Sequence, residues 1–242
     1  MSLKRTNDRK TTVRAGKAGE GHSSLLKNAF SLPSGKAYSC PGATSFCESV
    51  CYAGRIEKRF PKFLAVAMHN WNVLNDPNQD MLLNLMVMIE AFRGECEKFD
   101  APKLFRWHAD GDIFSKEYAQ AIAICAREFT DVQFWIYTRS FEYVQYITGY
   151  DNMAVYLSID DDNFQEGLKC YSDNPSVNIA WLGKTFDEAR GLKYSLAGGK
   201  YASHCPENKG TIPLITEKGG ACVSCGLCIF GKNNVSFSTS KK

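Results

Sequence analysis

The sequence predicts an α/β fold: a partial (β/α) barrel-like parallel sheet with an N-terminal cysteine loop and a C-terminal cysteine-rich cluster module. Short apolar runs alternate with segments whose apolar residues recur at helical spacing, a pattern typical of βαβ units. We count four or five such units, enough for an open or partial barrel but not for a closed eight-fold one. Seven of the ten cysteines also gather in two short loops near the ends of the chain.

The 242 residues suit one domain with a well-filled core, which we divide into three parts. Residues 1–29 form a basic leader, residues 30–200 the α/β core, and residues 201–242 the C-terminal module. The excess of lysine and arginine in the leader favours a solvated, disordered tail, with contact to nucleic acid as the alternative. No secretory signal or apolar run of bilayer length occurs, so we expect no membrane partner and a cytoplasmic location.

Helices and strands follow one another through the middle of the chain. Apolar spacing predicts a helix over residues 60–71, and Asp76-Pro77-Asn78-Gln79 is typical of the capped start of a second helix, whose apolar stripe covers residues 82–96. The pattern then predicts a strand over 103–107, a helix over 118–129, a strand over 132–137, a short helix from 141, and strands over 153–159 and 177–182. Thr185-Phe186-Asp187-Glu188 supplies a capping box for a last helix.

Polar residues follow three of these strands at the point where each one ends. The carboxyl ends of parallel strands meet at one rim, where α/β folds place their sites. A purely solvated role is the alternative for each residue, because loops are polar in any case. A further interpretation is metal-assisted hydrolysis by His108, Asp110 and Asp112. It requires the strand to continue through Gly111, so that the three side chains face the same side. The residues at these tips are His108, Asp110, Gly111 and Asp112, then Tyr137, Thr138 and Arg139, then Ser158, Asp160, Asp161 and Asp162.

The C-terminal cysteines have the spacing of a metal site. Cys222, Cys225 and Cys228 recur every third residue among glycines, and Cys205 lies seventeen residues upstream of the first. A close run of three cysteines plus a remote fourth is a ferredoxin-like way to hold a [4Fe–4S] cluster. Zinc is the alternative, although four-cysteine zinc sites typically pair two ligands with two. His204 could replace one thiolate, but its position beside Cys205 favours a bystander.

The N-terminal loop differs because it offers three cysteines, Cys40, Cys47 and Cys51. Cys96 lies on the apolar stripe of a predicted helix and is better explained as core. Three thiolates would hold a [4Fe–4S] cluster and leave one iron open to another ligand. An open coordination position is what a metal site needs for chemistry, whereas a fully protein-ligated one serves structure or electron transfer.

This order of motifs resembles the radical S-adenosylmethionine (SAM) enzymes. In that family the open iron binds the amino and carboxylate groups of SAM, and reduction of the cluster cleaves SAM to a 5′-deoxyadenosyl radical. The resemblance implies SAM and an electron donor as small-molecule and redox partners. It implies SAM contacts at Asp110, Gly111, Asp112, Tyr137, Arg139, Ser158 and Asp160. The spacing departs from the family, being C-x6-C-x3-C with Val50 before the last cysteine, where the family has C-x3-C-x2-C and an aromatic residue.

The whole chain after residue 30 is similar to a family of bacteriophage proteins called gene product eighty-eight. The resemblance rests on SLPSGKAYSCPGA, CYAGR, RWHADGDIFSKEY, FWIYTRS and the final CxxCGLC. It implies a phage origin, hence the host cytoplasm, and it supplies no reaction. Two function classes stay open: a radical-SAM-like enzyme with one open and one auxiliary cluster, or a non-catalytic iron–sulfur protein acting in redox or with nucleic acid.

Overall fold

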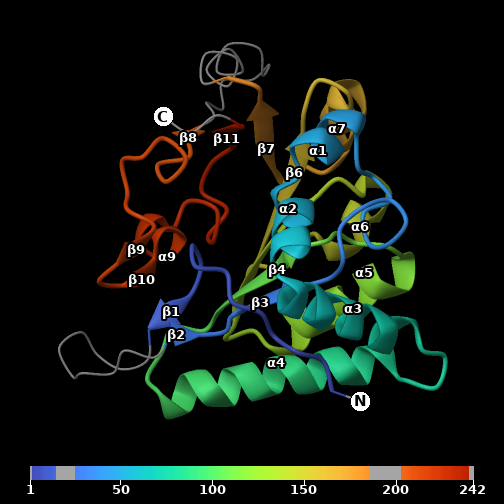
Figure 1. Ribbon diagram of the computed structural model, residues 1–242, viewed down its shortest axis with the longest axis vertical. Coiled ribbons are helices and arrows are strands. Elements are labelled where there is room, and N and C mark those ends of the chain that lie inside the picture. Colours follow the sequence, from blue (N-terminus) through green and yellow to red (C-terminus); the bar gives the residue numbers. More distant parts are fainter. Residues whose placement is uncertain (1, 15–24, 186–202, 240–242) are drawn as a thin grey trace.

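A computed structural model describes residues 2–14, 25–185 and 203–239 of the chain (Figure 1). The main sheet has seven strands in the order β3-β4-β5-β6-β7-β11-β8, and every neighbouring pair is parallel. The strands are β3 (Ala29–Ser31), β4 (Leu104–Asp110), β5 (Gln133–Thr138), β6 (Met153–Ile159), β7 (Asn178–Gly183), β11 (Val235–Ser238) and β8 (Ser203–His204). The sheet stays open between β3 and β8, so the predicted α/β fold with a barrel-like parallel sheet is confirmed.

The connecting helices cover one face of this sheet (Figure 1). They are α3 (Pro61–Asn75), α4 (Met81–Lys98), α5 (Lys116–Glu128), the short η1 (Phe141–Tyr143) with α6 (Val144–Ile147), and α7 (Phe164–Asp173). The core between helices and sheet is aromatic: Phe92 of α4 meets Phe105 at 5.2 Å between ring centroids, and Trp107 stacks on Phe134 at 5.8 Å. Such large buried rings hold the strands in place by apolar burial.

A second, antiparallel sheet joins the two ends of the chain. Its order is β2 (Leu25–Leu26), β1 (Val13–Arg14), β10 (Gly219–Gly220) and β9 (Ile215–Thr216), and α9 (Ala221–Cys225) follows β10 directly. Two backbone hydrogen bonds extend the contact, from Gly220 N to Thr12 O at 2.9 Å and from Cys222 N to Lys10 O at 2.8 Å. The N-terminal residues are therefore part of the support of the C-terminal module.

This arrangement corrects the expectation of a disordered leader over residues 1–29 for the described parts of that segment, residues 2–14 and 25–29. In the described parts of that segment, Leu3 and Val13 are buried, and β3 already begins at residue 29. Two of the basic residues have acidic partners elsewhere in the chain: Arg5 pairs with Glu95, and Lys10 pairs with Glu207 at 2.8 Å. Part of the positive charge over residues 2–14 is therefore used in ion pairs with distant acids, and these described residues are not a solvated tail.

Two local predictions also differ from the structure. Asp76 is not the cap of α4, because α3 runs up to it and its side chain accepts a bond from Asn78 N at 2.9 Å within the connecting turn. The cap of α4 is Asp80, which accepts from Leu83 N at 2.9 Å.

β4 extends three residues beyond the predicted strand, to Asp110. The helix predicted after Thr185 lies outside the described residues. None of the described helices is both long and apolar enough to cross a bilayer.

Candidate functional site

The N-terminal cysteine loop is fastened to the carboxyl end of β6. Thr44 caps α1 (Ser45–Val50) by accepting from Cys47 N at 2.9 Å, and its hydroxyl donates to Asp160 Oδ2 at 2.7 Å. Two residues on, Phe46 N donates to Asp162 Oδ2 at 2.9 Å. Two of the three aspartates that follow β6, Asp160 and Asp162, therefore fix the start of the helix that carries Cys47.

Cys40, Cys47 and Cys51 are all free thiols in this loop. Gly54 N, in the first turn of α2 (Tyr52–Arg59), donates to Cys51 Sγ at 3.4 Å. Cys47 is close enough to Cys40 to raise the pKa of Cys40, and Cys51 is close enough to Cys47 to raise the pKa of Cys47. Burial, reinforced by Asp112, raises the pKa of Cys40 to about 12. Burial also raises the pKa of Cys47, with Arg139 acting against it. Thiols of this kind stay neutral unless a cation binds them.

Three residues predicted at the rim surround this loop. Asp112 is buried and accepts from Ile113 N and from Arg139 N, both at 2.7 Å, while the Arg139 guanidinium pairs with Asp160 at 2.6 Å. Burial raises the pKa of Asp112 to about 6. The structure thus brings Asp112, Arg139 and Asp160 together beside Cys40 and Cys47, but each has protein partners. Their role as cofactor ligands stays a prediction.

Gly111 and Gly42 mark the closest approaches in this region. Gly111 has φ +87°, and a Cβ there would lie 2.5 Å from Ser39 Oγ, next to Cys40. A Cβ on Gly42 would lie 2.2 Å from Arg139 O. Any side chain at either position would push the cysteine loop off the strand tips, so both glycines are required by packing.

Other predicted rim residues lie elsewhere. Ser158 contributes its carbonyl, which accepts from Asn163 Nδ2 at 3.1 Å. Asp110 ends β4 as a buried carboxyl whose Oδ1 has no hydrogen-bond partner, and burial raises its pKa to about 7. Tyr137 turns away from the N-terminal loop and donates its hydroxyl to the thiol of Cys228. Tyr137 therefore belongs with the C-terminal cysteines.

His108 does not join the two aspartates that follow it. Its φ of +58° breaks the alternation of the strand, and its Nε2 lies 2.8 Å from the hydroxyl of Tyr118 on α5. Burial, followed by the Arg106 charge, lowers the pKa of His108 to about 3. Because His108 faces the helices while Asp112 bonds the backbone after β5, these side chains do not converge on one ion. The hydrolytic metal site considered from the sequence is not formed.

The four C-terminal cysteines come from two segments, since Cys205 follows β8 and the others lie on α9 and the turn after it. In Figure 1, α9 lies on the side of the main sheet away from α3, α4 and α5. Gly226, in the left-handed region at φ +67°, ends α9 and lets the chain turn between Cys225 and Cys228. Burial raises the pKa of Cys228 to about 12, and the charges of Cys205, Cys225 and Arg106 all act on it.

Two tyrosines and one arginine form the floor beneath these cysteines. Tyr156 donates to Leu227 O at 3.2 Å and to Asn233 O at 3.0 Å, which fixes the turn that carries Cys228. The guanidinium of Arg106 lies 5.3 Å from the Tyr137 ring centroid and pairs with Asp8. The sequence analysis missed Arg106, although a charged residue inside the apolar run of β4 was a visible signal.

The donor chemistry of the two groups can be compared with what a metal requires. No set of three or more His, Cys, Asp or Glu side chains in the described ranges is disposed to hold a metal ion. Thiols are nevertheless the donors that iron–sulfur clusters and zinc prefer, and each group offers mainly thiols. A cubane is a larger body than one ion, so its ligands stand farther apart than those of a zinc site. The residue types fit a cluster in each place.

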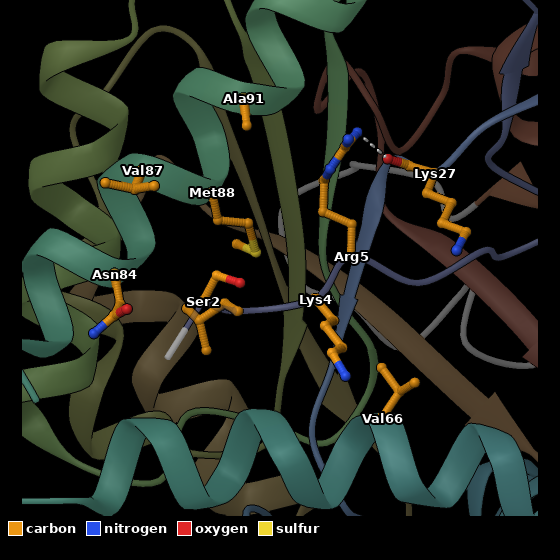
Figure 2. Close-up of a pocket in the computed structure, with 10 residues that line it drawn as sticks. Ser2, Lys4, Arg5, Lys27, Val66, Asn84, Val87, Met88 and Ala91 are labelled. Carbon is orange, nitrogen blue, oxygen red and sulfur yellow. Dashed lines mark hydrogen bonds between the residues drawn. The ribbon is translucent and has the colours of Figure 1, made fainter.

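The cleft drawn in Figure 2 is unconnected with the cysteines. It has a volume of about 410 Å³, and it lies between the N-terminal segment, α3 and α4. Arg5 crosses it to donate to Lys27 O at 2.7 Å (Figure 2). Its remaining lining consists of lysine, serine, asparagine, methionine and aliphatic side chains, without a cysteine or a carboxylate. The cysteine groups are therefore the candidate site.

Comparison with known proteins covers nearly the whole chain. The family model described as "Gene product 88" matches residues 1–231. The "Gene 88 protein" of Mycobacterium phage L5 is 41% identical over 244 residues, which is 99% of each chain. The protein of the same name from Mycobacterium phage D29 is 42% identical over 246 residues, 100% of this chain and 99% of its own. No solved structure gives a significant match.

These matches extend across both cysteine groups, and the two relatives are phage proteins. They give no support to the radical SAM resemblance, which stays a prediction. The resemblance to the phage family is confirmed, and the chain belongs to the Gene product 88 family.

Proposed function

We propose that this chain is an iron–sulfur protein with two [4Fe–4S] clusters, working as a radical-SAM-like enzyme in the cytoplasm of a phage host. Cys40, Cys47 and Cys51 would hold the cluster with an open iron. The auxiliary cluster would be held by Cys205, Cys222, Cys225 and Cys228. One observation carries the proposal: seven free thiols from opposite ends of the chain lie in two groups against one parallel sheet.

In each cysteine group the protein would supply the thiolate ligands, hold them in position and partly exclude water from the bound cluster. A bound cluster would supply one-electron chemistry, and at the three-cysteine site an open coordination position. Asp160 and Asp162 hold the loop through Thr44 and Phe46, so the spacing of its thiols is set by the tip of β6. Deprotonation of thiols whose pKa is raised by burial would be driven by the metal itself, because metal binding releases thiol protons.

SAM use is the finer part of the proposal. Asp112 and Arg139 lie beside Cys40 and Cys47, where a carboxylate suits the amino group of SAM and a guanidinium its carboxylate. Bound SAM would supply radical chemistry at this site once reduced by one electron, while Asp112 and Arg139 would hold its amino and carboxylate groups. The electron would come from a separate one-electron donor.

A second candidate is a non-catalytic iron–sulfur protein, and one observation favours it. Arg139 already pairs with Asp160, and Asp112 already accepts from two backbone amides. Groups with complete partners are suited to fixing the loop, and SAM would have to displace those partners. This candidate keeps both clusters and predicts no response to SAM.

The first experiment determines whether the clusters exist. Anaerobically purified protein should be brown and contain about eight irons per chain, four for each cubane. Cys225→Ala or Cys228→Ala should remove one cluster and destabilise the C-terminal module, because metal binding there contributes to folding. Cys96→Ala and Cys125→Ala are the matched controls, since both thiols are buried in the core and should leave the iron content unchanged. Stoichiometric zinc without visible absorption would contradict the proposal.

The second experiment separates the two candidates. SAM added to the reduced protein should change the electron paramagnetic resonance of the three-cysteine cluster and yield 5′-deoxyadenosine. Asp112→Ala should weaken the SAM response while both clusters remain, as shown by iron and sulfide analysis. Two intact clusters that ignore SAM would favour the non-catalytic protein.

A further inference from the structure

The C-terminal cysteines touch a buried charge that the sequence did not predict as functional. Arg106 projects from the middle of β4, its side chain is 13% exposed, and its Nε is buried without a hydrogen-bond partner. The positive charge acts on both Cys222 and Cys228. A cation held this close to a four-thiolate site favours the more negative state of whatever metal group the thiolates bind.

Tyr137 adds a second interaction at the same place. Its hydroxyl donates to Cys228, and its ring lies under the Arg106 guanidinium at 5.3 Å. Hydrogen bonds to ligating sulfur stabilise a reduced cluster, which is one of the ways in which proteins set a reduction potential. Asp8 holds the guanidinium from the other side, so Arg106 is fixed in this position.

The same arginine reaches toward the N-terminal cysteines. Its Nη2 lies 3.5 Å from the hydroxyl of Tyr52, which is the residue after Cys51. Tyr52 in turn donates to Ala109 O, which fixes the start of α2 against β4. A continuous series of contacts therefore runs from Cys228 through Tyr137, Arg106 and Tyr52 to Cys51.

We propose that Arg106 and Tyr137 set the reduction potential of a cluster held by the four C-terminal cysteines, and that the series of contacts from Cys228 to Cys51 is an electron relay between the two cysteine groups. The inference rests on the proposed function, because it requires both clusters. Clusters bound in the two groups would supply one-electron chemistry, and a separate one-electron donor would supply the electron, so no bond or proton would change.

The test begins with the full chain, reconstituted anaerobically and analysed for iron and sulfide. Both clusters are then reduced with dithionite and observed by electron paramagnetic resonance. Neighbouring reduced clusters should broaden one another's signals. The broadening should disappear in a Cys40→Ala, Cys47→Ala, Cys51→Ala variant, which keeps only the four-cysteine cluster. Two reduced clusters with independent, unbroadened signals would overturn the relay, whereas a chain without iron would overturn the proposed function.

A redox titration of the same samples tests the role of Arg106. In Arg106→Met the ratio of reduced to oxidised four-cysteine cluster, measured at the wild-type midpoint potential, should fall at least tenfold, which is 59 mV for a one-electron couple. Arg106→Lys should keep a ratio near that of the wild type because it keeps the charge. Tyr137→Phe should shift the ratio in the same direction as Arg106→Met. If Arg106→Met fails to retain its cluster, the ratio measured in Tyr137→Phe tests whether these contacts set the reduction potential.

Arg127→Met and Tyr143→Phe are the matched controls on the helix side of the sheet, and neither should move the ratio. An unchanged ratio in Arg106→Met or Tyr137→Phe, with the cluster fully present, would overturn the assignment.

Discussion

The buried ion pair beneath the N-terminal cysteine loop gives a sharp test of how that loop is held. Asp160 is fully buried, and Oδ2 accepts from Thr44 Oγ1 at 2.7 Å and from the Arg139 guanidinium at 2.6 Å. Its other oxygen accepts from Asp162 N at 3.0 Å. Replacing Asp160 with alanine removes all three bonds and leaves the guanidinium, itself 8% exposed, without the carboxylate that pairs with it.

The expected loss in the free energy of unfolding depends on which member of the Arg139–Asp160 pair is removed and on whether its charge is replaced. Removing one member of a buried pair costs about 3–5 kcal/mol, because an uncompensated charge stays buried. Asp160→Asn keeps an acceptor and loses the charge, so we expect a smaller loss of about 1–3 kcal/mol. Replacing Arg139 and Asp160 together by methionine and leucine should recover much of the stability, since apolar residues of similar size tend to substitute for a buried pair without loss.

The assay is urea unfolding of the metal-free protein, followed by the fluorescence of its buried tryptophans, together with the rate at which Cys47 reacts with a thiol reagent. Asp160→Ala should lower the free energy of unfolding by the stated amount and speed the thiol reaction, because the cap of α1 loses its support. Glu128→Ala is the control: its partner Arg127 is exposed, so the loss should stay below about 1 kcal/mol. A loss as small as this control in Asp160→Ala would refute the reasoning.

Three further outcomes follow from the described contacts. Gly42→Ala should lower the melting temperature because the new Cβ meets Arg139 O, at a cost of about 1–3 kcal/mol, whereas Gly94→Ala, with open space around it, should raise stability by up to about 1 kcal/mol. Burial raises the pKa of Asp110 to about 7, so the stability linked to its protonation is fully present below about pH 4 and is lost as the pH rises through about 7. Unfolding free energies at pH 5 and pH 8 should therefore differ less in Asp110→Asn. Deletion of residues 1–14 should abolish iron binding by the C-terminal cysteines, measured by iron analysis, whereas a merely solvated leader would leave it intact.

The strands were predictable from the sequence because apolar runs in a parallel sheet are buried on both faces. The run over residues 153–159 coincides with β6, and the run over 132–137 differs from β5 by one residue at each end. The ends of helices were less predictable. Asp76 has the sequence of a cap, yet Asp80, four residues on, is the one whose carboxylate meets a free helix amide. Local pattern alone does not distinguish two aspartates in one turn.

The leader was misjudged for a different reason. Its net positive charge is typical of a solvated tail, but Glu95 and Glu207, the acids that pair with Arg5 and Lys10, lie far away in sequence. Long-range pairing of this kind leaves no periodic signal. The same holds for β1, whose two residues gain their partners from β2 and from β10 at the other end of the chain.

The grouping of the cysteines was visible in the sequence, but the division of the polar residues between the two groups was not. Strand alternation sends Arg106 and Tyr137 to the face that carries the C-terminal cysteines, while Thr138, the next residue of β5, bonds Asp112 beside the N-terminal loop. The positive φ of His108 then reverses the alternation in β4 and turns the histidine toward the helices. Only the path of the backbone decides these directions.

One pair of neighbouring strands therefore serves both cysteine groups. β4 contributes Arg106 to the floor of the C-terminal group and Asp112, just past its end, to the rim of the N-terminal group. β5 does the same with Tyr137 and Arg139. Because the two strands are paired in register, a shift in either one moves both sites at once. The relative position of the two cysteine groups is therefore set by two paired strands.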